Sequence, residues 1–220
     1  MVNPHPEDST PVIVGCDPGL RKCGFAVAQP RNRLEDFILD STVVIPPSDA
    51  SDAERVRIVT AKLKRVLLEW PVEYILVETP TSLYVKKGRS IEALKMLLTL
   101  GAVYGAAGYM DVPVHGLSVK EWKGPKSHNK ADSVGLSKVI WPREKKKSAL
   151  TDDEAEAQLL CLSVVQPTEL RAAFMLMKMN VAPDRVMGTL KREWMYGARQ
   201  MQALEKRSGQ RLKAASRRGA

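Results

Sequence analysis

The sequence holds few of the residues that build disulfide frameworks, zinc sites or membrane spans. Among 220 residues there are three histidines and an odd number of cysteines, without the spacing of paired metal ligands: Cys16, Cys23 and Cys161. We therefore expect reduced, mostly buried thiols and no catalytic histidine. The most apolar stretch, residues 93–109, is interrupted by Lys95, glycine and threonine, so it is too short and too mixed to span a membrane.

The first ten residues, MVNPHPEDST, lack the cationic segment and the apolar core of a secretory signal. Their content of Pro, Asp and Ser is typical of a disordered lead-in over residues 1–10. The composition, with 44% hydrophobic and 27% charged residues, is that of a soluble globular protein. These features predict a soluble protein of the cytoplasm, or of a host's cytoplasm if the source is viral, without a membrane partner.

Positive charge is unevenly spread along the chain. The net charge is +9, and residues 185–220 alone hold ten Lys or Arg against two Glu, a net +8. Such clustering favours an acidic partner, most commonly nucleic acid, although an anionic membrane surface or mere solubility would also account for it. We interpret this segment as a detachable basic tail with Trp194 at its apolar centre.

The hydrophobic pattern predicts a mixed sheet covered by helices. Short apolar runs bounded by turn residues predict five strands, at Val12–Cys16, Gly24–Ala28, Phe37–Ile45, Tyr74–Val77 and Val112–His115. Helical spacing of apolar residues predicts four helices, at residues 51–70, Ile91–Tyr109, Lys130–Ile140 and Asp152–Val165. Three successive strands, followed by strands that alternate with helices, are typical of an α/β fold.

Carboxylates follow apolar runs where a buried element would not favour charge. Asp17 follows VIVGC and Glu78 follows YILV, while Asp153 and Glu156 stand three residues apart on one helix face. Taken singly, each has an ordinary explanation, because an Asp after a strand can form an Asx turn and acidic residues stabilise a helix N-terminus. Asp152 is more typical of an N-cap than of a ligand.

Taken jointly, these acids indicate a metal site. If the first and fourth strands are neighbours, Asp17 and Glu78 lie side by side. Carboxylates that converge without a cation would repel one another, whereas magnesium removes that cost. Two such ions about 4 Å apart suit phosphodiester displacement, so the acidic cluster and the basic tail together suggest a nuclease.

Four stretches resemble, in order, the motifs of the RuvC family of Holliday-junction resolvases within the RNase H-like superfamily. They are VGCDPGLRKCGFAV, LVETP, VKEWKG followed by NKADSV, and DDEAEAQLL, and the correspondence covers residues 12–166. The resemblance implies an α/β, RNase H-like fold, with a five-stranded mixed sheet flanked by helices on both faces. It also implies a homodimer that nicks four-way DNA junctions symmetrically with magnesium. On this basis residues 11–167 form the nuclease domain, and residues 168–220 form a helical, basic extension.

The resemblance also implies roles for individual residues. The catalytic metal ligands would hold two Mg²⁺ ions, with Mn²⁺ as a substitute, and are Asp17, Glu78, Asp153 and Glu156. Glu156 stands where the family usually has Asp, and its longer arm should still ligate. Lys123 and Lys130 would lie near the scissile phosphate, and the alternative for each is a solvated surface lysine.

Further DNA contacts are expected around the site. Tyr84, in the loop after Glu78, would stack on a base or else pack on its own domain. Basic residues that would contact phosphates are Arg21, Lys22, Lys86, Lys87, Arg89, Lys120 and Lys126. The glycine-spaced helix at Ile91–Tyr109 matches the family's dimer helix, although core packing would also explain its glycines.

Other functions stay open on the sequence alone. An actin- or sugar-kinase-type ATPase needs a second glycine-rich phosphate loop and a longer chain, and neither is present, so we expect no nucleotide cofactor. YqgF-type relatives linked to RNA processing share the opening motif but are shorter. Another RNase H-like nuclease acting on RNA, flaps or branched DNA is the nearest alternative. A non-catalytic nucleic-acid-binding relative is a further one, although every acidic position of the pattern is filled.

Overall fold

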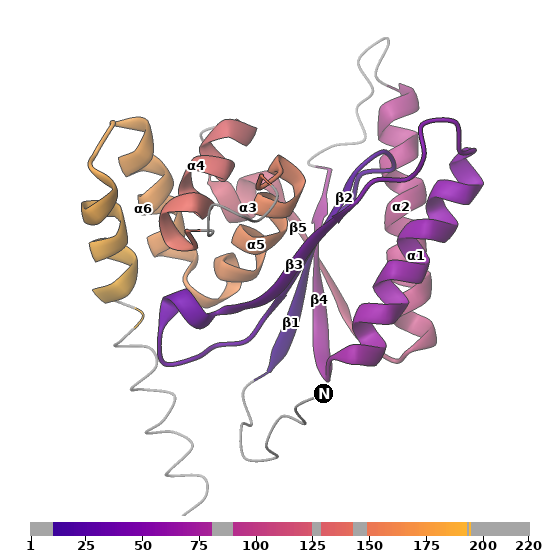
Figure 1. Ribbon diagram of the computed structural model, residues 1–220, viewed down its shortest axis with the longest axis horizontal. Coiled ribbons are helices and arrows are strands. Elements are labelled where there is room, and N and C mark those ends of the chain that lie inside the picture. The colour runs from indigo at the N-terminus through magenta and orange to yellow at the C-terminus, as the bar shows by residue number, and fades with distance from the viewer. Residues whose placement is uncertain (1–10, 81–89, 125–128, 143–148, 193, 195–220) are drawn as a thin grey trace, which may run out of the picture.

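Five strands form one mixed sheet in the order β3-β2-β1-β4-β5 (Figure 1). The computed structural model describes residues 11–80, 90–124, 129–142, 149–192 and 194. The strands are β1 (Val12–Asp17), β2 (Cys23–Ala28), β3 (Ile38–Val44), β4 (Val72–Thr79) and β5 (Val114–Ser118). Strand β2 is antiparallel to β1 and β3, whereas β1, β4 and β5 run parallel.

All five predicted strands are present, and one of them is displaced along the chain. Strand β5 begins two residues later than the pattern predicts. The reason is that the N–H of Val112 still donates to the carbonyl oxygen of Ala107, 3.0 Å away, and so closes the end of the preceding helix.

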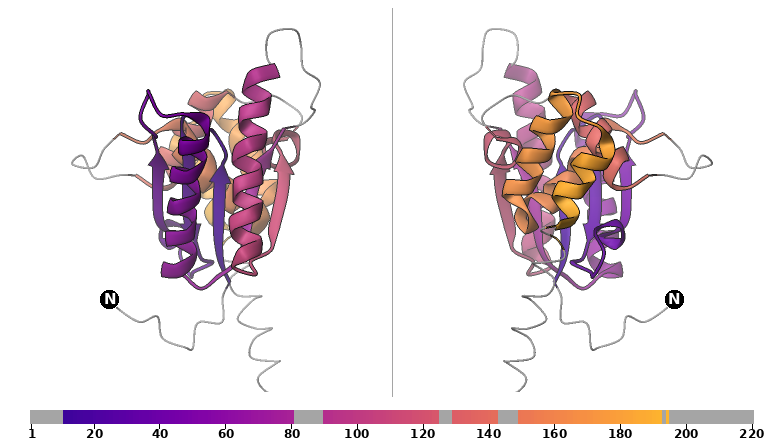
Figure 2. Two further views of the ribbon diagram at one scale, coloured as in Figure 1. Left: turned by 90° about the vertical axis from the view of Figure 1, so that its right-hand side faces the viewer. Right: turned by 90° about the vertical axis from the view of Figure 1, so that its left-hand side faces the viewer.

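Helices cover both faces of the sheet (Figures 1 and 2). One face carries α1 (Asp52–Glu69) and α2 (Ser90–Tyr109), and the short 3-10 helix η1 (Leu34–Asp36) precedes β3. The other face carries α3 (Val119–Lys123), α4 (Lys130–Ile140), α5 (Asp152–Val165), α6 (Pro167–Lys178) and a helical segment at residues 183–192. The predicted α/β class is confirmed. Helix α3 was not predicted, because five residues are too few to show a helical period. Within the described residues, no helix is both long and apolar enough to cross a membrane.

Two hydrophobic cores lie on opposite faces of the sheet. Alternate residues of β1 point to opposite sides, so that Val14 and Cys16 pack toward α1 and α2, whereas Ile13 packs toward α5. Both faces of β1 and β2 are therefore covered, and every residue of these two strands is buried.

Two glycines let α5 lie directly on the strands. A Cβ atom added at Gly15 would come within 2.2 Å of the carbonyl oxygen of Ala157, and one added at Gly24 within 2.0 Å of that of Asp153. Since no side chain fits there, the backbone of α5 is pressed against β1 and β2. This contact brings the acidic start of α5 to the end of β1.

The C-terminal helices continue the core of the α5 face. Their buried apolar residues belong to the same cluster as Ile13 and Leu76, and are Leu170, Ala173, Phe174, Val186, Leu190 and Trp194. Trp194 Nε1 donates to the carbonyl oxygen of Arg31 at 2.8 Å, and its ring packs edge-on against Phe37. The basic tail interpreted as detachable from residue 185 is thus anchored as far as Trp194, because its apolar residues complete this core.

Candidate active site

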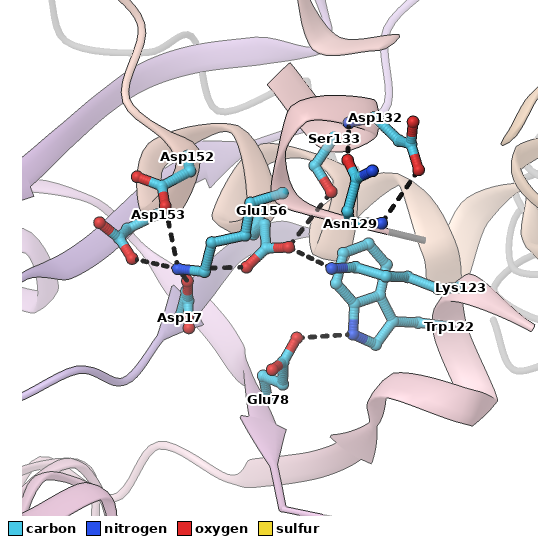
Figure 3. Close-up of polar contacts among 11 residues, drawn as sticks. Asp17, Glu78, Trp122, Lys123, Asn129, Asp132, Ser133, Asp152, Asp153 and Glu156 are labelled. Atoms are coloured by element: carbon cyan, nitrogen blue, oxygen red, sulfur yellow. Dashed lines mark hydrogen bonds and ion pairs between the residues drawn. The ribbon is translucent and has the colours of Figure 1, made fainter. Parts of the chain in front are cut away.

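Asp17 and Glu78 lie on neighbouring parallel strands. Cys16 of β1 is in register with Val77 of β4, so the next residue of each strand is a carboxylate at the same edge of the sheet. The first and fourth strands are thus neighbours, which is the condition under which the sequence places Asp17 and Glu78 side by side. Figure 3 shows both side chains directed toward the space in front of α5.

Helix α5 supplies the other two predicted carboxylates. Asp153 and Glu156 are buried and lie on the side of the helix that faces Asp17 (Figure 3). The N-cap of the helix is Thr151, whose hydroxyl accepts from the N–H of Glu154 at 3.2 Å. Asp152 is therefore the first helical residue rather than the N-cap.

Glu154 is buried as well but has a different partner. Its Oε1 accepts a hydrogen bond from Ser41 Oγ of β3 at 2.7 Å, and the same Oγ accepts from Gln158 Nε2 at 2.8 Å. These polar contacts join α5 to the edge strand of the sheet. They add to the glycine contacts in fixing how α5 lies.

The ammonium of Lys130 lies among the carboxylates. Its Nζ is 2.8 Å from Asp153 Oδ1, 3.2 Å from Asp152 Oδ2 and 3.8 Å from Glu156 Oε2. It is also 4.0 Å from Asp17 Oδ2. Lys130 is the first residue of α4, where a capping box between Asn129 and Asp132 starts the helix and places the lysine at the cluster. Its side chain is 53% exposed, so it reaches the site from solvent.

Lys123 occupies a different environment from Lys130. Its side chain is 5% exposed, and its Nζ donates to Glu156 Oε1, which also accepts from Ser133 Oγ at 3.2 Å. The alternative of a solvated surface lysine is therefore wrong for Lys123. Its ammonium lies 4.5 Å from the centroid of the Trp122 ring.

Trp122 and Ser133 are two site residues that the sequence did not single out. Trp122 Nε1 donates to Glu78 Oε2 at 3.1 Å, and its ring is buried. A tryptophan inside the lysine-rich VKEWKG stretch was a signal for Trp122, because a large apolar ring is highly buried on average. No signal of this kind marked Ser133.

The electrostatics of the site favour a cation. Burial, followed by the charges of Glu78 and Glu156, raises the pKa of Asp17 well above its ordinary value. Burial and the charge of Glu156 likewise raise the pKa of Glu78, against the charge of Lys123 and the Trp122 hydrogen bond. The pKa of Lys130 is raised, because the carboxylates around it outweigh the effect of its own burial.

The acidic residues fit a divalent cation by their chemistry. Asp17 Oδ2 and Asp153 Oδ2 are buried atoms that accept no hydrogen bond, which costs free energy that a directly bound metal cation would offset. Carboxylate oxygens are the ligands that magnesium and manganese prefer. Among the described residues no three acidic, thiol or imidazole groups are already arranged as a metal site. In this arrangement it is Lys130 that the carboxylates surround.

Three of the expected DNA contacts fall within the described residues. Arg21 and Lys22 are exposed in the turn after Asp17, and Lys120 is exposed on α3. The remaining expected contacts lie outside the described residues, and are Tyr84, Lys86, Lys87, Arg89 and Lys126.

The sequence was compared with known protein families to find which of them shares these acidic and basic residues. The profile of the family described as "Crossover junction endodeoxyribonuclease RuvC" matches residues 13–124, just over half of the chain. The chain belongs to the RuvC family. The matched segment includes Asp17, Glu78, Trp122 and Lys123, and the acids of α5 lie beyond it.

Curated RuvC proteins resemble the chain over part of their length. That of Corynebacterium glutamicum is 29% identical over 133 residues, which cover 58% of this chain and 57% of the relative. That of Corynebacterium efficiens is 28% identical over 159 residues, which cover 68% of this chain and 66% of the relative. The chain thus spans less than two thirds of the length of either corynebacterial protein.

Solved RuvC structures share the fold. Thermus thermophilus RuvC, in complex with a Holliday junction substrate, matches with a TM-score of 0.55 and 23% identity, over 81% of this chain and 96% of that one. Another Thermus thermophilus RuvC structure gives a TM-score of 0.52 and 24% identity, over 70% and 95%. The fold of this chain is accordingly the RNase H-like α/β fold of RuvC.

Proposed function

We propose that this RuvC-family protein is a metal-dependent, structure-selective DNA endonuclease that resolves four-way junctions by paired symmetric nicks. The observation that carries the proposal is the convergence of two strand ends and one helix start on a single cluster, in which Asp17, Asp153 and Glu156 are buried and Glu78 is partly buried. Membership of the family supports the reaction type.

The four carboxylates would hold two Mg²⁺ ions, or Mn²⁺ in their place. The raised pKa values of Asp17 and Glu78 support this assignment, as do the buried oxygens of Asp17 and Asp153 that accept no hydrogen bond. When bound, such ions supply an activated water and neutralise charge at the scissile phosphate. Glu156, in place of the usual aspartate, reaches the cluster through Oε2 while its Oε1 is held by Lys123 and Ser133.

Lys130 is the lysine suited to contact the phosphate. Its half-exposed side chain pairs with Asp153 at the solvent side of the cluster, so rotation of its long stem would bring the ammonium to a bound DNA strand. Arg21, Lys22 and Lys120 would bind flanking phosphates, since all three are exposed. The same role is proposed for the basic residues near Tyr84, with Tyr84 itself stacking on a base at the crossover.

The outer face of α2 is a candidate dimer interface. Large apolar side chains are exposed on this helix, and are Leu94, Leu97, Leu98, Tyr104 and Tyr109. A Cβ atom added at Gly101, Gly105 or Gly108 would meet nothing within 4 Å, so packing within the described chain does not account for these glycines. A second copy of α2 could approach closely there, and a two-fold dimer would provide two sites for two symmetric nicks. The left view of Figure 2 shows α2 beside α1, in front of the sheet.

Sedimentation analysis tests this interface. Leu98→Glu on α2 should convert dimers to monomers, whereas Met179→Glu should not, since Met179 is exposed beyond α6 on the opposite face. Dimers that persist in Leu98→Glu would contradict the assignment of this face.

The three cysteines support a reducing compartment. Cys16, Cys23 and Cys161 are all buried free thiols, as is usual for proteins of the cytoplasm. We place the protein in the cytoplasm of a cell or of a viral host, where its DNA substrate would be found.

Cleavage of labelled substrates tests the function. With Mg²⁺, the full chain should cut a four-way junction far faster than a flap, an RNA–DNA hybrid or a plain duplex. Equal cutting of all four would reject junction resolution, and preferred cutting of the hybrid or the flap would favour the alternative nuclease functions. Asp17→Asn should abolish cleavage but leave junction binding nearly intact, because the substitution removes one ligand oxygen without changing the shape of the side chain.

A further inference from the structure

Two consecutive residues of α3 hold two of the proposed ligands. Trp122 Nε1 donates to Glu78 Oε2 at 3.1 Å, and Lys123 Nζ donates to Glu156 Oε1. Glu78 belongs to β4 and Glu156 to α5, so α3 connects acids from two separate elements (Figure 3). Neither donor is exposed, since Trp122 is 1% and Lys123 4% exposed.

The position of α3 after β5 brings its two donors close to Glu78 and Glu156. It begins directly after β5, whose Leu117 is in register with Glu78. Glu121 Oε2 accepts from the N–H of Ser118 at 2.7 Å and closes the first turn. The helix therefore starts at the edge of the sheet that presents Glu78, and its next turn reaches toward α5.

The far side of α3 rests on α6. The Trp122 ring packs edge-on against Phe174, with ring centroids 6.2 Å apart. Arg171 donates to the carbonyl oxygen of Glu121. With α6 behind it, α3 is held in place, and its two donors are held with it.

We infer that Trp122 and Lys123 are positioning residues that fix Glu78 and Glu156 at the separation the metal ions require. This inference rests on the proposed function, because it assigns a role toward the same ions. It also means that Lys123 does not contact DNA, since its ammonium is buried against Glu156 and the Trp122 ring and does not face a bound strand. Donors that orient ligands in this way commonly change metal affinity by about 10- to 100-fold when they are removed.

Calorimetric titration with Mn²⁺ alone, without DNA, tests the inference. Trp122→Phe keeps the ring against Phe174 but removes the N–H donor, without a change of charge. It should bind Mn²⁺ at least about tenfold more weakly than the wild type. An unchanged affinity of this variant would overturn the role of Trp122.

Lys123→Met separates positioning from simple electrostatics. Loss of a nearby positive charge would by itself tighten cation binding, whereas loss of a positioning donor weakens it. We expect weaker binding in Lys123→Met and substantial recovery in Lys123→Arg, which restores a cationic donor to Glu156. Tighter or unchanged binding in Lys123→Met would overturn the role of Lys123.

Two controls keep the outcomes distinct. Lys138→Met removes an exposed lysine from α4 and should bind Mn²⁺ as the wild type does. Circular dichroism and thermal melting confirm that each variant is folded before titration. A wild type that binds no divalent cation would refute the metal site of the proposed function. A wild type that binds, together with variants that bind equally well, would refute the positioning role alone.

Discussion

Lys130 Nζ lies 2.8 Å from Asp153 Oδ1, and so joins the first residue of α4 to the first turn of α5. Three further carboxylates, of Asp17, Asp152 and Glu156, are within 4.0 Å of the same nitrogen. One ammonium thus offsets much of the repulsion of the cluster. A divalent cation would compete with it for the same oxygens.

Replacement of Lys130 by Met should therefore have opposite effects on stability and on metal binding. Without added metal, the variant should lose roughly 1–2 kcal/mol of unfolding free energy, less than a fully buried pair would lose, because Lys130 is half exposed. Its affinity for Mg²⁺ should rise several-fold, since the competing cation is gone, whereas cleavage should slow. Urea unfolding in EDTA and calorimetry with Mg²⁺ measure the two effects. Weaker Mg²⁺ binding would contradict this competition.

Asp17→Asn should stabilise the metal-free protein at neutral pH. The pKa of Asp17 is raised on folding, chiefly by burial, so its contribution to stability is complete below the unfolded pKa of about 4 and is lost as the pH rises through the folded pKa. Asn does not ionise, so the variant does not lose this stability as the pH rises. In EDTA its melting temperature should exceed that of the wild type at pH 7.5 by a few °C, about 2–4 °C per kcal/mol, and the difference should shrink toward pH 4.

A matched substitution checks that this pH dependence belongs to the cluster. Asp49→Asn alters an exposed aspartate that is not part of the carboxylate cluster, and its melting temperature should follow that of the wild type at both pH values. Mg²⁺ should raise the melting temperature of the wild type more than that of Asp17→Asn. A destabilised Asp17→Asn at pH 7.5 would mean that the carboxylate supports the fold.

Gly15→Ala should be strongly destabilising. Its Cβ would meet the backbone of α5 at Ala157, which cannot rotate away, so we expect a cost of about 3 kcal/mol or more and weaker Mn²⁺ binding as α5 is displaced. Gly188→Ala is the control, because a Cβ there meets nothing within 4 Å within a helical segment. That variant should gain about 0.5–1 kcal/mol from helix propensity. Urea unfolding measures the stability of both variants. Equal stabilities would contradict the close contact between Gly15 and Ala157.

Two truncated chains should distinguish the effect of the C-terminal positive charge on DNA binding from the effect of the C-terminal apolar residues on stability. Removal of residues 195–220 deletes seven Lys or Arg and leaves Trp194 in place. This chain should melt as the wild type does and show a flatter dependence of junction affinity on salt, if those residues contact phosphates. Removal of residues 185–220 also takes Val186, Leu190 and Trp194 from the core, and should cost several kcal/mol. Equal melting temperatures of the two truncated chains would contradict the anchoring role of Trp194.

The strand ends and the start of α5 were accessible from the sequence, because each acid follows or opens an apolar pattern. Asp17 and Glu78 interrupt the ends of two apolar runs, and the TDDEAEAQLL stretch combines an N-cap with a buried helix. Their convergence, however, depends on β1 lying beside β4 and on the absence of a side chain at Gly15. The order of strands in a sheet depends on contacts between distant segments, and the pattern within one strand does not specify its neighbour.

The different surroundings of the two lysines were not accessible from the sequence. Lys123 and Lys130 both occur in a polar, lysine-rich stretch, and nothing local distinguishes them. Lys123 is buried because Trp122 beside it packs against Phe174, more than fifty residues later. Likewise, the anchoring of Trp194 depends on Phe37 and on the Arg31 carbonyl, near the other end of the chain.

Because Trp122 packs against Phe174, the geometry of the site depends on whether α6 stays folded when the protein is heated. The acids lie on β1, β4 and α5, which pack against one another, whereas α3 is held in place by its contacts with α6. Regions with separate stabilities open separately on heating. Fraying of the C-terminal helices would release Trp122 while the sheet is still intact, so a metal ion bound at the proposed site would be lost at a lower temperature than the one at which the sheet melts. The temperature range of the proposed activity would then be set by α6 and not by the strands that carry the acids.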